Sequence, residues 1–435
     1  MNWVIRVDKK CFYVLFTLLY YIITSALTSS LGLNKFFLYL GDVLNVVLFI
    51  YTLLYKKKTR KKIDNKVIYL MFLIIIIGVF VNIINFSSSF LLIWGIRNIA
   101  RFFMFFYSCS ILLKPQNYKT VFKVIKIMFF LSLPLCIYQR LFAIYSNGKT
   151  FGDLVGGIFL SYPGCNTPLN ILLCVYVAYI ASRFFQKKEK MVNFLIVVIS
   201  AMIMSALAEL KIFLVEFFII ILMNCIYNKM SLVKILKLTM IIIAFSLLMS
   251  AFISFNSKEY GENYVNIYSA DGFIEYATRE NGYDGDGDLN RLNAISIINT
   301  TIFKNDITKQ IFGIGLGNSE YTQFYQSDFY KRYSYVHYQW FNDIIVYIEQ
   351  GYLGIILYML LAVQMYKKCK KSNNEYQCFS KILIILCSIM FIYNNSLRME
   401  ASGFLIYLLL SIAYNCNFLS KTIRKEINIY DTQNN

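Results

Sequence analysis

The chain has 435 residues, of which 58% are hydrophobic and only 15% are charged, and its formal net charge is +19. A soluble domain needs a polar surface, so this composition excludes an ordinary soluble protein and indicates that lipid surrounds much of the chain. The lysines stand between apolar blocks instead of covering one surface. The basic charge therefore indicates membrane orientation, and we expect no nucleic-acid partner.

Apolar blocks recur along the whole chain, and each is long enough to cross a hydrocarbon layer of roughly 30 Å. We therefore predict an all-α polytopic membrane protein with about twelve transmembrane helices. A single integral membrane domain over residues 1–435 contains all of them. The predicted spans are residues 11–30, 36–55, 67–86, 90–113, 121–146, 168–186, 191–208, 210–227, 234–255, 338–366, 379–396 and 402–420.

Positive charge alternates between the predicted connections. Lysines and arginines fill residues 56–66, 187–190 and 367–371, and the connections between them carry almost none. Lysine-rich connections stay on the cytoplasmic side of a membrane. We therefore expect a multi-pass protein of the bacterial inner membrane with both termini in the cytoplasm.

One connection differs from the others in length and composition. Residues 256–337 form a hydrophilic stretch of about 80 residues, and loops of this length usually fold locally or carry function. The predicted orientation makes this stretch a large periplasmic loop. We expect the chemistry of the protein on that side.

Five cations lie within or at the ends of predicted spans, at a similar depth near the external surface: Arg97, Arg101, Arg140, Lys211 and Arg398. A charge inside a membrane costs several kcal/mol, so each needs a partner or a task. We expect the cluster to bind an anionic group such as a phosphate. The alternative is that the cations pair with acidic residues at similar depths, namely Asp42, Glu209, Glu216, Glu349 and Glu400.

His337 is the only histidine in the chain, and it stands where the large loop meets the tenth predicted span. An imidazole titrates near neutrality, so His337 is a candidate general base. The alternative is an interfacial residue with a satisfied hydrogen bond. Asp343 and Glu349 follow along the same predicted helix.

Tyrosines are concentrated at the end of the large loop, among them Tyr321, Tyr325 and Tyr335. Aromatic rings can stack on sugars, which makes these three residues candidates for binding a glycan. The alternative is an aromatic belt at the membrane interface.

Two short motifs indicate structure and not a cofactor. Gly313-Ile-Gly315-Leu-Gly317 follows no strand of a βαβ unit, so it predicts a tight turn and not a dinucleotide site. Asp284, Asp286 and Asp288 resemble a calcium loop, but Leu289 takes the position of its glycine. We expect no metal and no cofactor.

The order of several residues, together with twelve spans and a late external loop, resembles the O-antigen polymerase and O-antigen ligase superfamily. These residues are Arg291, the stretch Ile311-Phe-Gly-Ile-Gly-Leu-Gly317, His337 and the stretch Glu349-Gln-Gly351-Tyr-Leu-Gly354. The resemblance implies a membrane-embedded glycosyltransferase of GT-C-like architecture. Its reaction is an inverting, metal-independent transfer, and its donor is a glycan on undecaprenyl pyrophosphate.

The resemblance also implies roles for individual residues. Arg291 and Lys211 match basic positions of the family, although the family often has arginine where Lys211 stands. His337 matches the histidine region of the family but lies about one helical turn further from Gly351. His337, Glu349 and Arg291 are the catalytic residues that the resemblance implies.

The function that we expect is polymerisation of lipid-linked O-antigen repeat units, with membrane lipid, a chain-length regulator and a flippase as further partners. The nearest alternative is an O-antigen ligase that transfers the finished chain to lipid A core. The span pattern is also compatible with a flippase for lipid-linked oligosaccharides or with a scaffold protein of the export machinery.

Overall fold

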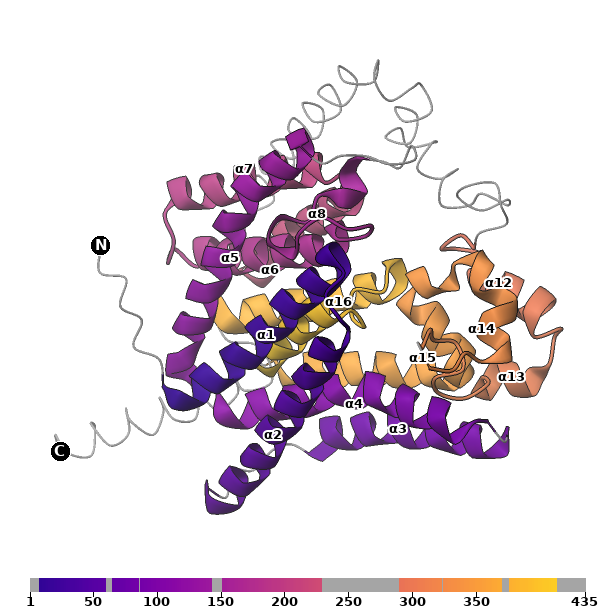
Figure 1. Cartoon of the computed structure of the whole chain (residues 1–435). Helices are drawn as coiled ribbons and strands as arrows, with labels where there is room; N and C mark the ends of the chain where they lie inside the picture. The colour runs from indigo at the N-terminus through magenta and orange to yellow at the C-terminus, as the bar shows by residue number, and fades with distance from the viewer. Residues whose placement is uncertain are drawn as a thin grey trace, which may run out of the picture.

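The computed structural model describes residues 8–59, 65–85, 87–142, 151–228, 289–322, 324–369 and 375–412 (Figure 1). Within these ranges all regular secondary structure is helical. Eight of the described helices are long and apolar enough to cross a membrane: α1 (Lys9–Leu31), α2 (Phe36–Thr59), α3 (Asn65–Ile84), α4 (Ser89–Leu112), α5 (Pro115–Phe142), α6 (Asn166–Phe185), α15 (Asn342–Lys368) and α16 (Glu375–Tyr393). The chain is therefore a multi-pass helical membrane protein.

Of the other four predicted spans, 191–208 and 210–227 correspond to two shorter helices, and the remaining two lie wholly or partly outside the described residues. The helices α7 (Met191–Leu207) and α8 (Lys211–Tyr227) have 17 residues each. At 1.5 Å per residue such a helix is about 26 Å long, somewhat less than the hydrocarbon thickness. The apolar helix Glu400–Ile412 reaches the edge of the described ranges. The predicted span 234–255 lies outside the described residues, as do residues 256–288 of the large loop.

The outer face of α3 shows why these helices suit lipid. Val67, Met71 and Ile74 are buried against the rest of the protein, whereas Phe72, Ile76 and Phe80 are exposed. A helix that is apolar all round is stable only where both faces avoid water. The exposed face of α3 is therefore a surface for lipid.

The helix α15 lies at the centre of the described structure. It packs against α3, α16 and the short helix α13 (Ile307–Phe312). In Figure 1, α3 runs alongside α15 and packs against α4, and α5 to α8 form a second group. In that group α6 packs against α8 and α16. Two short turns between α5 and α6, η1 (Phe151–Leu154) and η2 (Gly157–Phe159), pack on α5.

The predicted span 338–366 corresponds to α15, with two differences. The helix begins at Asn342, and its backbone is non-helical at Gly351, with φ 62° and ψ −161°. A Cβ atom at Gly351 would lie 2.3 Å from the carbonyl oxygen of Ile311, so no other residue fits there. Because the helix is interrupted there, backbone carbonyl groups of α15 are free to accept hydrogen bonds from residues 314 and 315. Ile314 N donates to Ile348 O at 2.8 Å, and Gly315 N donates to Glu349 O at 2.9 Å.

The described residues 289–341, which we call the loop module, surround the first turns of α15. They contain α12 (Ala294–Ile297), η3 (Ile298–Ile302), α13, α14 (Asp328–Tyr333), η4 (Ser334–Val336) and η5 (Tyr338–Trp340). Figure 1 shows α12, α13 and α14 gathered at this end of α15. The module has its own apolar core, which includes Leu289, Ile298, Phe303 and Phe341. This core holds the module to α15, since Ile344 and Ile348 belong to it.

Candidate functional site

A cavity of about 440 Å³, which we call the arginine cavity, lies beside the first turns of α15. The end of α1, the start of α2, the first half of α4, residues 319–321 and the turn 394–399 line it. Three arginines from two distant parts of the sequence line this cavity: Arg97 and Arg101 of α4, and Arg398 of the turn. Arg97 and Arg101 are one helical turn apart, as their spacing predicted.

Arg97 is fixed by an aspartate of the neighbouring helix. Its Nε lies 2.7 Å from Oδ2 of Asp42 on α2, and its guanidinium carbon lies 4.6 Å from the ring centroid of Trp94. The hydroxyl of Tyr21 on α1 donates to the other oxygen of Asp42 at 2.8 Å. Three helices therefore determine where this guanidinium lies.

Arg101 is the most deeply buried of the three arginines. Its Nη1 pairs with Oε1 of Glu400 at 2.9 Å, and its Nη2 donates to the carbonyl oxygen of Arg398 at 3.4 Å. Its buried Nε has no hydrogen-bond partner among the described residues. An unsatisfied buried donor is costly, so Arg101 retains capacity for one more acceptor.

Arg398 and α4 are joined through Glu320. Oε1 of Glu320 pairs with Arg398, and Oε2 accepts a hydrogen bond from Asn98 on α4. Glu320 thus lies between two elements of the cavity wall. A carboxylate in this position occupies the donors that an anionic ligand would need.

A fourth cation, Lys35, lines the arginine cavity at the start of α2. Its Nζ lies 5.3 Å from the ring centroid of Tyr321, which also lines the cavity. Among the described residues Lys35 has no ion pair, whereas each arginine of the cavity is paired with a carboxylate. The lining therefore has a surplus of positive charge.

Glu349 is a residue of α15 that lies close to Arg398, and it is almost completely buried. Its Oε1 accepts hydrogen bonds from the backbone N–H of Gly317 at 2.9 Å and from the hydroxyl of Ser319 at 2.8 Å. Its Oε2 lies 3.7 Å from Nη2 of Arg398 and accepts no hydrogen bond from the part of the chain that the structure describes. Glu349 does not line the cavity but supports the wall that carries Ser319 and Glu320.

The glycine-rich stretch forms the tight turn that the sequence predicts. Gly317 has φ 79°, and a Cβ atom there would lie 2.0 Å from the carbonyl oxygen of Leu91 on α4. The turn therefore touches both α4 and α15. This double contact places Ser319 and Glu320 at the cavity.

The other predicted cations lie elsewhere. Arg140 at the end of α5 pairs with Glu209 at 3.0 Å, and Lys211 begins α8 two residues later. Arg291 donates to the carbonyl oxygen of Tyr393 at 3.1 Å and lies over the Tyr393 ring at 4.3 Å. None of these three lines the arginine cavity. The expected single cluster is thus divided: three members line one cavity, and the other two do not.

Ion pairing with acidic residues holds for several of the cations. Asp42, Glu400 and Glu209 each pair with an arginine, as the ion-pair interpretation of the sequence predicted. Glu216 does not: it accepts hydrogen bonds from Asn170 and Cys174 in the group of α6 and α8. Ion pairing within a cavity does not exclude ligand binding, because a dianionic group can displace a single carboxylate.

His337 stands outside the cavity lining. It has a left-handed backbone (φ 52°), and its ring stacks on Trp340 with centroids 4.5 Å apart. Gln339, two residues further along the chain, lines the arginine cavity instead. Of the three candidate tyrosines only Tyr321 lines it, while Tyr325 and Tyr335 are exposed on the loop module.

Sequence reasoning missed three residues of this cavity: Lys35, Asn98 and Glu320. Lys35 had a signal, because it is a rare cation in a connection that otherwise carries almost no positive charge. Glu320 follows the glycine turn by three residues, but nothing in the local sequence relates it to Arg398. The residues described contain no group of three or more His, Cys, Asp or Glu side chains arranged to hold a metal ion. Asp284, Asp286 and Asp288 lie outside the described residues.

No known protein family matches the chain, and no curated protein is significantly similar to it. The resemblance to the O-antigen polymerase and ligase superfamily therefore depends on the residue order and span pattern of the chain itself.

Proposed function

We propose that the protein is a membrane-embedded glycosyltransferase that polymerises undecaprenyl-pyrophosphate-linked O-antigen repeat units at the external face of the bacterial inner membrane. The observation that carries this proposal is the arginine cavity. Arg97, Arg101 and Arg398 come together there with Lys35, which has no ion pair among the described residues. Guanidinium groups bind phosphate oxygens through two parallel hydrogen bonds, which suits a diphosphate.

The orientation follows from the distribution of lysines. The helices α2, α6 and α15 are all followed by lysine-rich connections, and the arginine cavity lies beside the start of α2 and α15. If these connections are cytoplasmic, the cavity faces the external side. A lipid-linked glycan that has already crossed the membrane would meet the cavity there.

Glu320 has a position suited to two roles. Without substrate it neutralises Arg398 and accepts a hydrogen bond from Asn98. A diphosphate that binds Arg398 would displace this carboxylate. The freed carboxylate would then be close to the bound glycan and able to accept a proton.

In the proposed reaction, the hydroxyl oxygen of the acceptor sugar attacks the anomeric carbon of the donor. The bond between that carbon and the phosphate oxygen breaks, and its electron pair remains on the diphosphate. The hydroxyl proton passes to Glu320. Arg97, Arg101, Arg398 and Lys35 stabilise the negative charge that develops on the leaving group, which lowers the barrier.

Lys35 offers the cleanest test of the proposal. Replacing Arg398 would leave Glu320 and Glu349 without their cation, so loss of activity could reflect damage to the fold. Lys35 has no ion pair within the described ranges, so Lys35→Gln leaves no described carboxylate unpaired. We expect the KM for the lipid-linked donor to rise about tenfold, with unchanged thermal stability.

The measurement uses purified protein and lipid-linked repeat units, with oligomer formation followed in the presence of a chelator. Lys367→Gln at the other end of α15 is the matched control, because it removes an exposed lysine and should change nothing. An unchanged KM for Lys35→Gln would contradict the proposed phosphate site. Transfer to lipid A core without oligomers would assign the protein to the ligases.

A further inference from the structure

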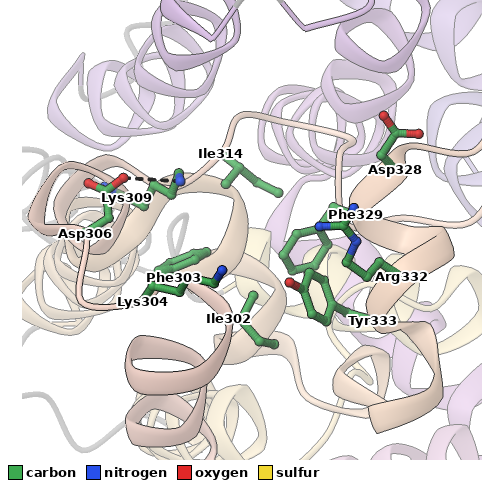
Figure 2. A pocket seen from close by; sticks show the side chains of 10 residues that line it. All are labelled: Ile302, Phe303, Lys304, Asp306, Lys309, Ile314, Asp328, Phe329, Arg332 and Tyr333. Carbon is green, nitrogen blue, oxygen red and sulfur yellow. Dashed lines mark hydrogen bonds and ion pairs between the residues drawn. The ribbon is translucent and has the colours of Figure 1, made fainter.

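The loop module contains a second cavity, of about 510 Å³, which Figure 2 shows from close by. We call it the module cavity. Its walls are apolar and aromatic: Ile302, Phe303, Ile314, Phe329 and Tyr333. Charged side chains surround these walls: Lys304, Asp306, Lys309, Asp328 and Arg332. Aromatic walls with a charged rim are unlike a lipid-facing groove, which has no use for charge.

Two of the three cations at the module cavity have no carboxylate partner among the described residues. Lys309 pairs with Asp306 at 3.2 Å, and this contact lowers the pKa of the Asp306 carboxyl. Lys304 and Arg332 form no ion pair with any described residue. Figure 2 shows Lys304 and Arg332 on opposite walls of the cavity. Positive charge therefore lies on both sides of the module cavity.

The backbone around Lys304 is held in an uncommon conformation. Lys304 and Asn305 both have a positive φ angle, 50° and 60°, which residues other than glycine rarely adopt. Hydrogen bonds hold this turn, from Asn305 N to Asn299 O at 2.8 Å and from Asp306 N to Phe303 O at 3.0 Å. Strained positions of this kind persist where the surrounding structure determines them, and they are frequent in binding sites.

The aromatic wall is packed against further rings and is connected to the arginine cavity. The ring of Phe329 packs against Tyr333 and Tyr338, with centroids 5.1 and 5.6 Å away. Burial raises the pKa of Tyr338, so its hydroxyl stays protonated and donates to the carbonyl oxygen of Ser319 at 2.6 Å. Ser319 lines the arginine cavity, and Ile314 of the same segment lines the module cavity. Residues 314–319 thus connect the two cavities.

We propose that the module cavity binds an acidic sugar, one that carries a carboxylate, in the glycan that accepts the transferred chain. The aromatic rings would contact the apolar face of the sugar ring, and Asp328 would accept hydrogen bonds from its hydroxyls. The sugar carboxylate would pair with Arg332, which can bind it through two hydrogen bonds, and with Lys304. A neutral sugar would offer neither cation an anionic partner. The role as acceptor site depends on the proposed function, whereas the preference for an acidic sugar does not.

Direct binding to the purified full-length protein tests this inference without the donor. The probe is a tetrasaccharide of alternating glucuronic acid and N-acetylglucosamine, and the neutral comparison is a tetrasaccharide of N-acetylglucosamine alone. We expect the acidic tetrasaccharide to bind at least about tenfold more tightly by calorimetry. Arg332→Gln and Lys304→Gln should each remove most of this preference. Phe329→Ala should weaken the binding of both probes.

Lys331→Gln is the matched control, because it removes the neighbouring cation of α14, whose ammonium lies 6.0 Å from the Tyr325 ring and outside the cavity. Thermal stability should be unchanged in the lysine and arginine variants, since Lys304, Lys331 and Arg332 are exposed. Equal binding of the two tetrasaccharides would overturn the inference. Displacement of the acidic probe by millimolar inorganic phosphate would overturn it too, because the cavity would then be a general anion site.

The outcomes separate this inference from the proposed function. If the acidic tetrasaccharide binds in the expected way but no oligomers form from lipid-linked repeat units, the acidic-sugar site is supported and polymerase activity is refuted. If oligomers form and neither tetrasaccharide is preferred, polymerase activity is supported and the acidic-sugar site is refuted.

Discussion

Glu320 is the residue on which the proposed chemistry of the arginine cavity depends. It accepts hydrogen bonds from an arginine and an asparagine that lie far from it in the sequence. In the proposed reaction this carboxylate is exchanged for a diphosphate and then takes a proton. The two roles have opposite effects on binding and on turnover, so one substitution can distinguish them.

Glu320→Gln should lower kcat by about 10² or more, because a glutamine cannot accept the proton. The KM for the donor should fall or stay the same, because the neutral side chain no longer competes with the diphosphate for Arg398. Initial rates over a range of donor concentrations measure both. A merely structural role would change stability and leave no such difference between kcat and KM.

Glu189 provides the matched control for Glu320. It also accepts hydrogen bonds from an arginine and an asparagine, Arg183 at 3.0 Å and Asn193 at 2.8 Å, but it lies in the lysine-rich connection before α7. Glu189→Gln should leave kcat and KM unchanged. Equal losses of activity in the two variants would argue against Glu320 as the base.

At the scale of elements, the glycine turn and the interruption of α15 act together. Gly351 interrupts the helical backbone of α15. The backbone N–H groups of the glycine turn then donate hydrogen bonds to the carbonyl oxygens of Ile348 and Glu349. The turn then passes close to α4 at Gly317 and brings Ser319 and Glu320 to the cavity. The site therefore depends on irregular backbone that is shielded from lipid by helices, as the absence of water in a membrane requires.

Gly317→Ala should destabilise the protein by about 2–4 kcal/mol, since the new Cβ atom would clash with the backbone of Leu91. Thermal unfolding of the purified protein measures this loss. Activity should fall as well, because relief of the clash moves Glu320. An unfolding temperature equal to that of the parent protein would contradict the tight packing of this turn.

Gly164→Ala separates backbone strain from the clash. Gly164 has φ 84°, close to the 79° of Gly317, but nothing lies within 4 Å of the position of its Cβ. This variant should lose only about 1 kcal/mol, the usual cost of a left-handed backbone for a residue other than glycine. The difference between the two variants is then the cost of the clash.

At the scale of the whole molecule, the lysine-rich connections and the loop module belong to opposite ends of α15. Lys367 and Lys368 end this helix, and residues 289–341 pack around its start. A helix of 27 residues is about 40 Å long, enough to separate two sides of a membrane even with its interruption. The charge distribution predicts that the lysine end lies in the cytoplasm.

This orientation predicts which positions a membrane-impermeant maleimide reaches in intact spheroplasts. Cysteine introduced at Phe324 or Tyr335, both exposed on the loop module, should be labelled from outside. Cysteine introduced at Lys57 or Lys367 should be labelled only after the membrane is permeabilised. The parent protein serves as the background. Labelling of all four positions from the same side would refute the orientation.

The sequence by itself determined that the chain is a helical membrane protein and predicted most of its spans. Hydrophobic length and the position of lysines are local properties, and lipid tolerates few alternatives to a helix. The starts of α1 to α4 and of α6 lie within two residues of the predicted spans for this reason. The pair Arg97 and Arg101 was also visible, because both lie on one turn of one helix.

Only the tertiary structure decided which of the candidate residues meet. Arg398 and Glu320 lie 78 residues apart in the sequence, and their contact depends on how α4, α15 and the glycine turn pack. The same packing separates Arg140 and Lys211 from the arginine cavity. It also places the ring of His337 in a stack with the ring of Trp340, outside the cavity. Side chains from distant segments come together through the summed packing of the helices between them, and no local pattern of residues contains that information.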